Sequence, residues 1–363
     1  MRAICFLYGQ PLQRLHDHGA VLSAISPVWA LREVASYLEE ERAPSYKALA
    51  FRRAAQTIEV LPPGEVESLW RKGRLEDLPR VGATTAAVIA EALAGSEPAY
   101  LTALRERAAP WPEGTSGDLL KSVAGDCHTH SDWSDGGVPI EHMAREAIAL
   151  GRQYMALTDH SPRLTVAHGL DADRLRRQIE TVAALNDTLA PFRILTGIEV
   201  DILEDGSLDQ DPALLAQLDV VVASVHSKLR MDGTTMTKRM VKAVLDPNVD
   251  ILGHCTGRIV VGRGRPQSSF DAAAVFAACS RAGTAVEINS RPERLDPPDD
   301  LLEQAKDAGC RFSIDSDAHA PGQLRWLRYG CEKAAKVGIT AQAVINCRRL
   351  PDLLEFTQRH DPG

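Results

Sequence analysis

Apolar residues recur at spacings of three and four from residue 27 to about residue 107, as in Val28, Leu31, Val34 and Leu38. This period is typical of amphipathic helices. Short breaks that contain Pro or Gly, at residues 43–44, 61–64 and 95–98, mark the expected helix ends. We therefore predict a small all-α domain over residues 27–108, preceded by an extension of unknown role at residues 1–26.

A stretch rich in Pro and Gly begins a predicted linker over residues 109–122, and the pattern then changes. Short β-type runs predict seven strands, at residues 123–127, 154–158, 193–200, 220–225, 249–253, 284–288 and 311–315. Amphipathic stretches between them predict helices at residues 140–150, 172–188, 236–245, 270–281 and 298–308. Alternating strands and helices are typical of a parallel sheet, and this many repeats favour a closed barrel. We expect the α/β class, with a distorted (β/α)7 TIM-like barrel over residues 123–356.

The net charge, the cysteines and the length of the apolar stretches disfavour several classes of protein. The chain of 363 residues has a formal net charge of −8, which disfavours a protein that binds nucleic acid along its whole surface. Any contact with DNA should therefore be local. The seven cysteines form no CxxC pair, and no apolar stretch approaches 18 residues. These features favour reduced thiols and a cytoplasmic location.

Nine potential metal ligands stand at the predicted strand ends or close after them. They are six histidines and three carboxylates: His128, His130, Asp135, His160, Glu199, His226, His254, Asp317 and His319. In a parallel β/α barrel the carboxyl ends of the strands meet at one face. The members of the pairs 128/130 and 317/319 are two residues apart, so on an extended chain both side chains point to the same side. The spacing therefore predicts a single cluster.

Imidazoles and carboxylates are ligands that Zn, Mn and Fe accept, and a bridging carboxylate can hold two ions roughly 3.5–4 Å apart. A lone histidine at a strand end is more often structural than a ligand. We expect structural or surface roles for the five remaining histidines, which are His16, His18, His142, His168 and His360. For the set of nine taken together, a metal centre is the better interpretation.

The motifs H-x-H-x4-D, T-D-H, G-x-E, S-V-H, G-H and D-x-D-x-H between Asp126 and His319 resemble those of the PHP domain, the polymerase and histidinol phosphatase family. The resemblance implies a (β/α)7 barrel that holds three divalent ions. It assigns one ion to His128, His130, Glu199 and Asp317, a second to Glu199, His226 and His254, and a third to Asp135, His160 and His319. Many members of the family have His at the position of Asp135. The Asp here resembles the PHP domain of bacterial family X DNA polymerases, which also has Asp at this position.

Several basic residues follow predicted strand ends and are candidates for phosphate binding, because Arg grips phosphate through a fork of N–H groups. They are Lys228, Arg258, Arg263, Arg265 and Arg291. We prefer Arg258 and Arg291 as catalytic-site residues and expect solvated surface for the others. Asp159, beside His160, is a third candidate: it would either orient a metal ligand or be held by backbone amides.

The segment from Leu78 to Ile89 resembles a helix-hairpin-helix motif, whose glycine turn exposes backbone amides to a nucleic-acid phosphate. The residues around Tyr46 to Ala55 resemble the small N-terminal domain of family X polymerases. These resemblances imply DNA contacts by Lys47, Arg52, Arg80, Gly82 and Thr84. Thr84 and Val88 stand where lyase-active members carry Lys, which argues against lyase activity, and no polymerase palm is present.

The leading hypothesis is a metal-dependent phosphoesterase that acts on DNA, as a 3′–5′ exonuclease or repair nuclease. A rival hypothesis is a small-molecule phosphatase of the histidinol-phosphate type, in which the helices only cap the barrel. A third is a non-catalytic scaffold that binds DNA. The complete set of metal ligands favours an enzyme, and the sequence does not indicate the oligomeric state.

Overall fold

The computed structural model describes residues 25–358. Most of the predicted extension, together with His16, His18 and His360, lies outside the described residues. Within them, contacts group the chain into two compact units: residues 25–32 with 50–103, and residues 33–49 with 104–358. No helix in this part of the chain is long and apolar enough to cross a membrane. The predicted domain boundaries stay predictions.

Residues 27–107 are helical, as predicted. The helices are α1 (Pro27–Glu40), α2 (Ser45–Glu59), α3 (Glu65–Arg71), α4 (Ala83–Leu93) and α5 (Ala99–Arg107), with a 3-10 turn at Leu75–Asp77. In α2 the buried Phe51, Ala54 and Ile58 lie on one face of the helix. The ring of Phe51 stacks on that of Tyr100, with centroids 5.5 Å apart. The spacing of apolar residues thus builds the core of the first unit.

The second unit is a barrel of seven parallel strands, which confirms the predicted α/β class. The strands are β1 (Gly125–Thr129), β2 (Tyr154–Leu157), β3 (Arg193–Asp201), β4 (Val220–Ser224), β5 (Ile251–Leu252), β6 (Ala285–Asn289) and β7 (Phe312–Asp315). Each strand pairs in parallel with its neighbour along the chain. A parallel bridge between Thr129 and Ala318 joins the first strand to the segment after the last. This contact brings both ends of the sheet together.

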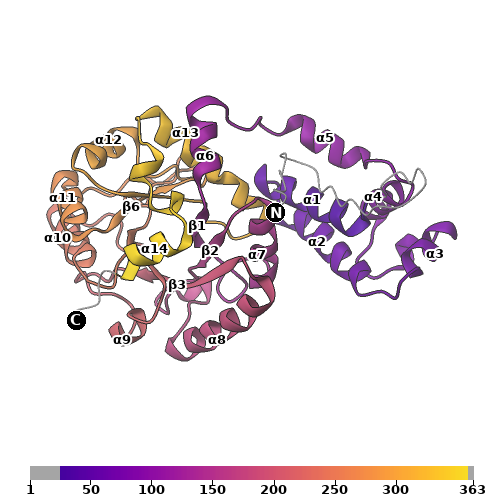
Figure 1. The fold of residues 1–363 in the computed structure, drawn as a ribbon, viewed down its shortest axis with the longest axis horizontal. Helices are drawn as coiled ribbons and strands as arrows, with labels where there is room; N and C mark the ends of the chain where they lie inside the picture. Colours follow the sequence, from indigo (N-terminus) through magenta and orange to yellow (C-terminus); the bar gives the residue numbers. More distant parts are fainter. Residues whose placement is uncertain (1–24, 359–363) are drawn as a thin grey trace, which may run out of the picture. The chain divides into compact units, whose positions relative to one another are not determined.

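Helices surround the strands (Figure 1). They are α7 (Ile140–Ala149), α8 (Ala172–Leu189), α9 (Pro212–Leu215), α10 (Gly233–Val244), α11 (Ala272–Ala282), α12 (Asp299–Asp307) and α13 (Leu327–Lys336). Four of them begin after an aspartate whose carboxylate accepts a hydrogen bond from a backbone N–H of the first turn, at Asp171, Asp211, Asp232 and Asp271. Such caps are the local signal that ends each loop at the start of a helix.

Two further helices complete the second unit. The second half of the segment predicted to be a linker is helical: α6 (Gly114–Ser122) carries Leu119 and Leu120 into the main apolar core. The C-terminal helix α14 (Leu350–Thr357) contributes Leu353 and Phe356 to a cluster with the strands. These apolar contacts fix the strands in place, so the side chains that follow the strand ends have a rigid support.

Candidate metal centre

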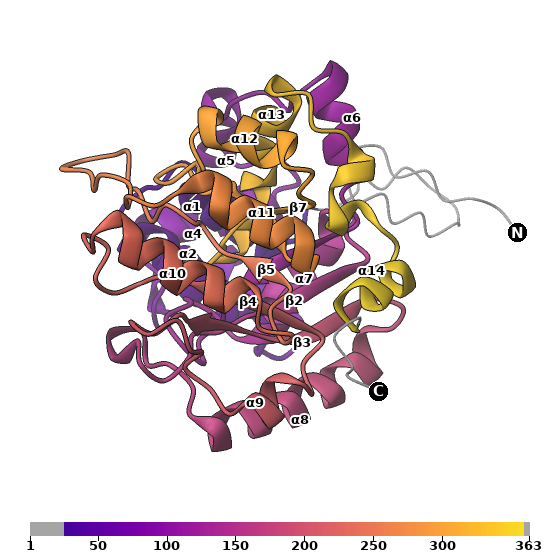
Figure 2. The ribbon, with the colours of Figure 1, turned by 90° about the vertical axis from the view of Figure 1, so that its left-hand side faces the viewer.

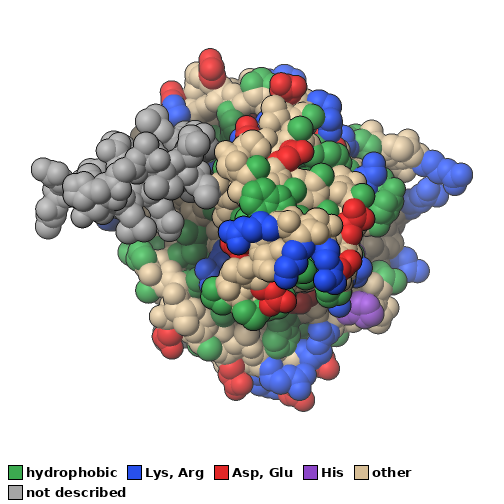
Figure 3. Space-filling view, turned by 90° about the vertical axis from the view of Figure 1, so that its right-hand side faces the viewer, with side chains coloured by type: hydrophobic (Ala, Val, Ile, Leu, Met, Phe, Trp, Pro, Cys, Tyr) green, Lys and Arg blue, Asp and Glu red, His purple; other side chains and the backbone are tan. Residues whose placement is uncertain are grey.

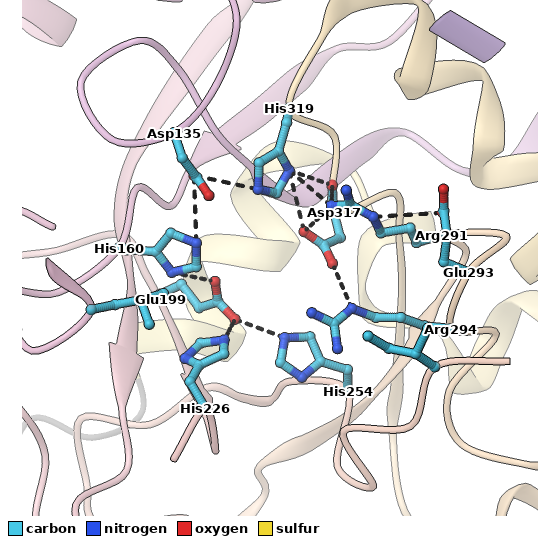
Figure 4. A pocket seen from close by; sticks show the side chains of 12 residues that line it. Asp135, His160, Glu199, His226, His254, Arg291, Glu293, Arg294, Asp317 and His319 are labelled. Atoms are coloured by element: carbon cyan, nitrogen blue, oxygen red, sulfur yellow. Dashed lines mark hydrogen bonds and ion pairs between the residues drawn. The ribbon is translucent and has the colours of Figure 1, made fainter. Parts of the chain in front are cut away.

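All nine predicted ligands converge at one end of the barrel. Figure 4 labels seven of them, with the carboxylate of Glu199 on β3 among the imidazoles. Its Oε2 atom lies 3.3 Å from Nε2 of His128 and 2.9 Å from Nδ1 of His160. Its Oε1 atom lies 3.1 Å from Nε2 of His226 and 2.9 Å from Nε2 of His254. The two oxygens therefore face different imidazoles, which is the arrangement of a carboxylate that bridges two cations.

The two other carboxylates extend the cluster on the side of His319 (Figure 4). Oδ1 of Asp135 lies 3.5 Å from Nε2 of His160 and 3.4 Å from Nε2 of His319. Oδ1 of Asp317 lies 3.5 Å from Nε2 of His130. Donor atoms of three groups come within 4.8 Å of one another: His130, Asp135, His160 and His319; His128, His130 and Glu199; His160, Glu199 and His226. His130 and His160 thus each belong to two of the three groups, where the resemblance placed each of them in one.

The burial and the protonation state of His130 fit a bound cation. His130 is fully buried, and neither of its ring nitrogens has a hydrogen-bond partner within the described residues. Burial, together with the neighbouring His319 and His160, lowers the pKa of His130 well below its usual value. A buried neutral imidazole with free nitrogens is costly unless a metal ion accepts a lone pair. The residues present therefore fit a divalent cation.

The carboxylates show the complementary shift. Burial of Glu199 opposes its ionisation, but the imidazoles of His226, His128 and His160 lower its pKa well below the usual value. The pKa of Asp317 is also lowered, because Arg291 and the histidines outweigh its burial. Against the effect of burial, neighbouring carboxylates raise the pKa values of His128 and His226, so a cation bound there would displace a proton from each ring.

Two further carboxylates, which the sequence analysis missed, hold the imidazoles from behind. Oε1 of Glu287 on β6 lies 2.7 Å from Nδ1 of His128, and its Oε2 accepts a hydrogen bond from the backbone N–H of His254. Oδ1 of Asp201 contacts Nδ1 of His226. With Nδ1 bound to these carboxylates, Nε2 of His128 and of His226 faces Glu199 in the cavity. The available signal was an acidic residue inside an otherwise apolar buried strand.

Asp159 lies outside the cavity lining and supports the loop before Asp135. Its carboxylate accepts hydrogen bonds from the backbone N–H of Ser131 at 2.8 Å, and from the side chains of Ser131, Ser134 and Gln178. These four contacts give Asp159 a positioning role in the loop. The structure thus favours the alternative in which backbone and side-chain donors hold this carboxylate.

The cavity over the cluster has a volume of about 320 Å³, and two arginines line it. Nη1 of Arg291 lies 3.4 Å from Oδ1 of Asp317, and Nε of Arg294 lies 3.4 Å from Oδ2 of the same carboxylate (Figure 4). Arg294 was not among the candidates. Arg258 is not in the lining: its Nε donates to the backbone oxygen of Arg294, so it holds the loop that carries the other two arginines.

The remaining basic candidates also lie outside this lining. Lys228 and Arg263 are exposed, and Nε of Arg265 donates to the backbone oxygen of Gly257. Of the histidines without an expected metal role, His168 is exposed and His142 is partly buried in α7.

In the first unit, the turn before α4 has the local geometry of the motif that it resembles. Gly82 is the N-cap of α4, and its backbone N–H donates to Oγ1 of Thr85 at 2.9 Å. Arg80, Gly82 and Thr84 are exposed at this helix start, whereas Arg52 is only 8% exposed. Burial thus argues against a direct contact of Arg52 with a DNA backbone.

Lys47 on α2 is also exposed. On the face in Figure 3, small groups of Lys and Arg side chains alternate with acidic and apolar ones. This mixture agrees with local rather than extended binding of a polyanion.

Comparisons with known proteins match both parts of the chain. The PHP domain family matches residues 126–291, and a helix-hairpin-helix domain family matches residues 26–97. The chain is 40% identical over 242 residues to the DNA polymerase/3′-5′ exonuclease PolX of Bacillus subtilis. That match covers 67% of this chain and 42% of the relative, so the chain spans less than half of that protein.

Further relatives are named as phosphatases. A probable phosphatase of Thermoanaerobacter sp. is 30% identical over 232 residues, which cover 61% of this chain and 89% of the relative. Among solved structures, a histidinol phosphate phosphatase of Lactococcus lactis in complex with zinc, L-histidinol and phosphate is 22% identical. The superposition covers 61% of this chain and 94% of that one, with a TM-score of 0.42. The motifs, the matched family and these sequence relatives agree: the chain belongs to the PHP family of metal-dependent phosphoesterases.

Proposed function

We propose that this protein hydrolyses phosphoester bonds in DNA, as a 3′–5′ exonuclease or a repair nuclease. The observation that carries the hydrolytic part is the carboxylate of Glu199, whose two oxygens divide four imidazoles between them within 3.3 Å. A carboxylate in this position suits two adjacent cations, and Asp135 with His130, His160 and His319 would supply donor atoms for a third.

The chain's own residues supply the remaining requirements for hydrolysis. Zn, Mn or Fe ions bound by the nine ligands would polarise phosphoryl oxygens and lower the pKa of water. Arg291 and Arg294 present N–H groups to the same cavity and would hold the substrate phosphate, whose charge they match. Both guanidinium groups also neutralise Asp317, so an anionic substrate meets less repulsion at this wall.

DNA is supported by the first unit and by the similarity to a relative named as an exonuclease. The N–H of Gly82 is bound to Thr85, but Ala83 and Thr84 in the first turn of α4 are exposed, and the backbone N–H groups of such a turn can bind a phosphate. Such contacts bind the backbone without reading its sequence, which suits an enzyme that must accept any strand end.

A small phosphomonoester is the second candidate. The relatives named as probable phosphatases match this chain over most of their own length, for example 89% of the Thermoanaerobacter protein. A cavity of about 320 Å³ is also within the range of small-ligand sites. On this alternative the first unit would have no part in substrate binding.

A substrate panel separates the two candidates. Full-length protein loaded with Mn²⁺ or Zn²⁺ is given a 5′-labelled single-stranded oligonucleotide, a gapped duplex and histidinol phosphate. We expect the oligonucleotide to shorten from its 3′ end, and Asp317→Asn to abolish this. Asp307→Asn, an exposed position on α12, is the matched control and should retain activity. Turnover of histidinol phosphate without turnover of DNA would establish the phosphatase instead.

A negative charge introduced at the turn tests whether the first unit binds DNA. Gly82 has a φ of −107°, and a Cβ atom added there would meet no atom within 4 Å, so a side chain fits. Asp and Asn are both good N-cap residues, but only Asp repels a phosphate. We expect Gly82→Asp to weaken binding of single-stranded DNA and Gly82→Asn to have a smaller effect. Equal affinities of the two variants would remove this turn from the DNA site.

A further inference from the structure

A β-hairpin stands beside the metal cavity, in the segment that joins β5 to α11 and projects from the barrel (Figure 2). Ile259 and Arg265 pair through two backbone hydrogen bonds of 2.9 and 2.8 Å, and the N–H of Gly264 donates to the oxygen of Val261. Gly262 and Gly264 have φ values of 61° and 65°, which the tight turn requires. The hydrogen bonds give this segment a defined conformation.

The base of the hairpin is attached to the loop that carries the two cavity arginines. The backbone N–H of Val260 donates to the oxygen of Glu293 at 2.7 Å, and Arg258 donates to the backbone oxygens of Arg294 and Leu295. Ile259 itself lines the cavity. The surface of the hairpin is therefore continuous with the wall of the metal site.

The tip of the hairpin is apolar and basic, although the whole chain is acidic. Val260 is 52% exposed and Val261 is 36% exposed, and Arg263 is exposed beside them. Residues 258–265 include three arginines and no acidic residue, in a chain with a net charge of −8. Val260 and Val261 leave apolar surface exposed next to the cavity and beside a basic residue, which makes this patch a candidate contact surface for a ligand.

We propose that this hairpin binds the single DNA strand that leads into the metal cavity, with Val260 and Val261 against base faces and Arg263 near a backbone phosphate. This inference rests on the proposed action on DNA. An unpaired strand offers both the flat apolar faces and the negative charge that this surface matches. A duplex hides its base faces by stacking, and a substrate confined to the cavity does not reach the turn, which extends about 7–10 Å past the paired residues.

The test compares a 30-nucleotide single strand with bis(p-nitrophenyl) phosphate, a diester too small to reach the tip. For the double variant Val260→Ser/Val261→Ser, we expect KM for the 30-mer to rise at least about tenfold more than KM for the small diester. Arg263→Ala should raise KM for the 30-mer and reduce its dependence on salt, because a phosphate contact is lost. Ile148→Ser and Arg281→Ala, exposed on α7 and α11, are the matched controls.

Each other outcome is decisive. If KM for the 30-mer does not change, the hairpin does not bind DNA, and a protein partner would be the remaining occupant. If KM rises by the same factor for both substrates in the double variant and in Arg263→Ala, the hairpin only supports the cavity, and the proposal is wrong. If the wild-type protein cleaves the small diester but not the 30-mer, the proposed function fails and the hairpin assignment fails with it. Cleavage of the 30-mer by wild type and variants alike overturns the hairpin assignment alone.

Discussion

Replacing Glu287 by Gln should weaken metal binding although this residue does not face the cavity. One carboxylate oxygen accepts from Nδ1 of His128 at 2.7 Å, and the other accepts from the backbone N–H of His254. Although burial disfavours the charged imidazole, Glu199 and Glu287 together raise the pKa of His128. A glutamine has nearly the same shape but only one acceptor oxygen. Its NH₂ group must therefore face one of the two donors.

The magnitude follows from that mismatch. A buried donor left without an acceptor costs about 1–3 kcal/mol. Loss of the carboxylate behind a metal-bound histidine costs about 10–100-fold in metal affinity or activity. Both effects act on the holo form, because the ring of His128 must present an unprotonated Nε2 to the ion. We expect Glu287→Gln to raise the dissociation constant for Zn²⁺ or Mn²⁺ by about 10–100-fold.

The assay is competition against a chromogenic chelator, with kcat measured at saturating metal. Glu303→Gln, exposed on α12, is the control and should bind metal as the wild type does. Unchanged affinity in Glu287→Gln would mean that the carboxylate does not orient His128, and the role assigned to it would be wrong. A loss of activity that saturating metal fully restores would place the whole effect on ion binding.

Three further predictions concern the ions, the phosphate and the surface. Mn²⁺ at about 100 times its dissociation constant should stabilise the fold by about 2.7 kcal/mol. Differential scanning fluorimetry should show a higher melting temperature, and Asp317→Asn should remove most of the rise. Arg291→Lys should lower kcat/KM by about tenfold, because Lys keeps the charge but loses the fork; equal activity would show that charge alone suffices. Hydrogen bonds from the lysines of α13, Lys333 first, lower the pKa of Asp299 to about 2. Asp299→Asn should therefore cost about 0.5–1 kcal/mol in urea unfolding near pH 7, an effect present above about pH 4 and lost as the pH falls towards 2.

The sequence pattern predicted the order and number of the barrel strands because six of the seven are buried along their whole length, and in β3 only the first residue is exposed. The predicted strand boundaries were less accurate where polar site residues interrupt the apolar pattern. The first strand was expected at residues 123–127, but β1 spans Gly125–Thr129 and includes His128. Its pairing with β2 shifts register between Asp126 and Thr129. Polar ligands inside a strand interrupt the apolar pattern by which a strand is recognised. The periodicity of one sequence also gives no sign of a register shift between two strands.

The sequence located the site residues on strands more accurately than those on loops. Glu199 lies within β3, and Asp317 follows β7 by two residues, so the parallel sheet alone brings them to one face. Arg258 and Arg294 lie further from strand ends, and their directions depend on contacts between different loops. The guanidinium of Arg258 binds the backbone that positions Arg294 for the cavity. A residue's distance along the chain from a ligand therefore predicts its role only where a strand fixes its direction. In loops, the hydrogen bonds to the backbone decide which arginine reaches the substrate and which one supports it.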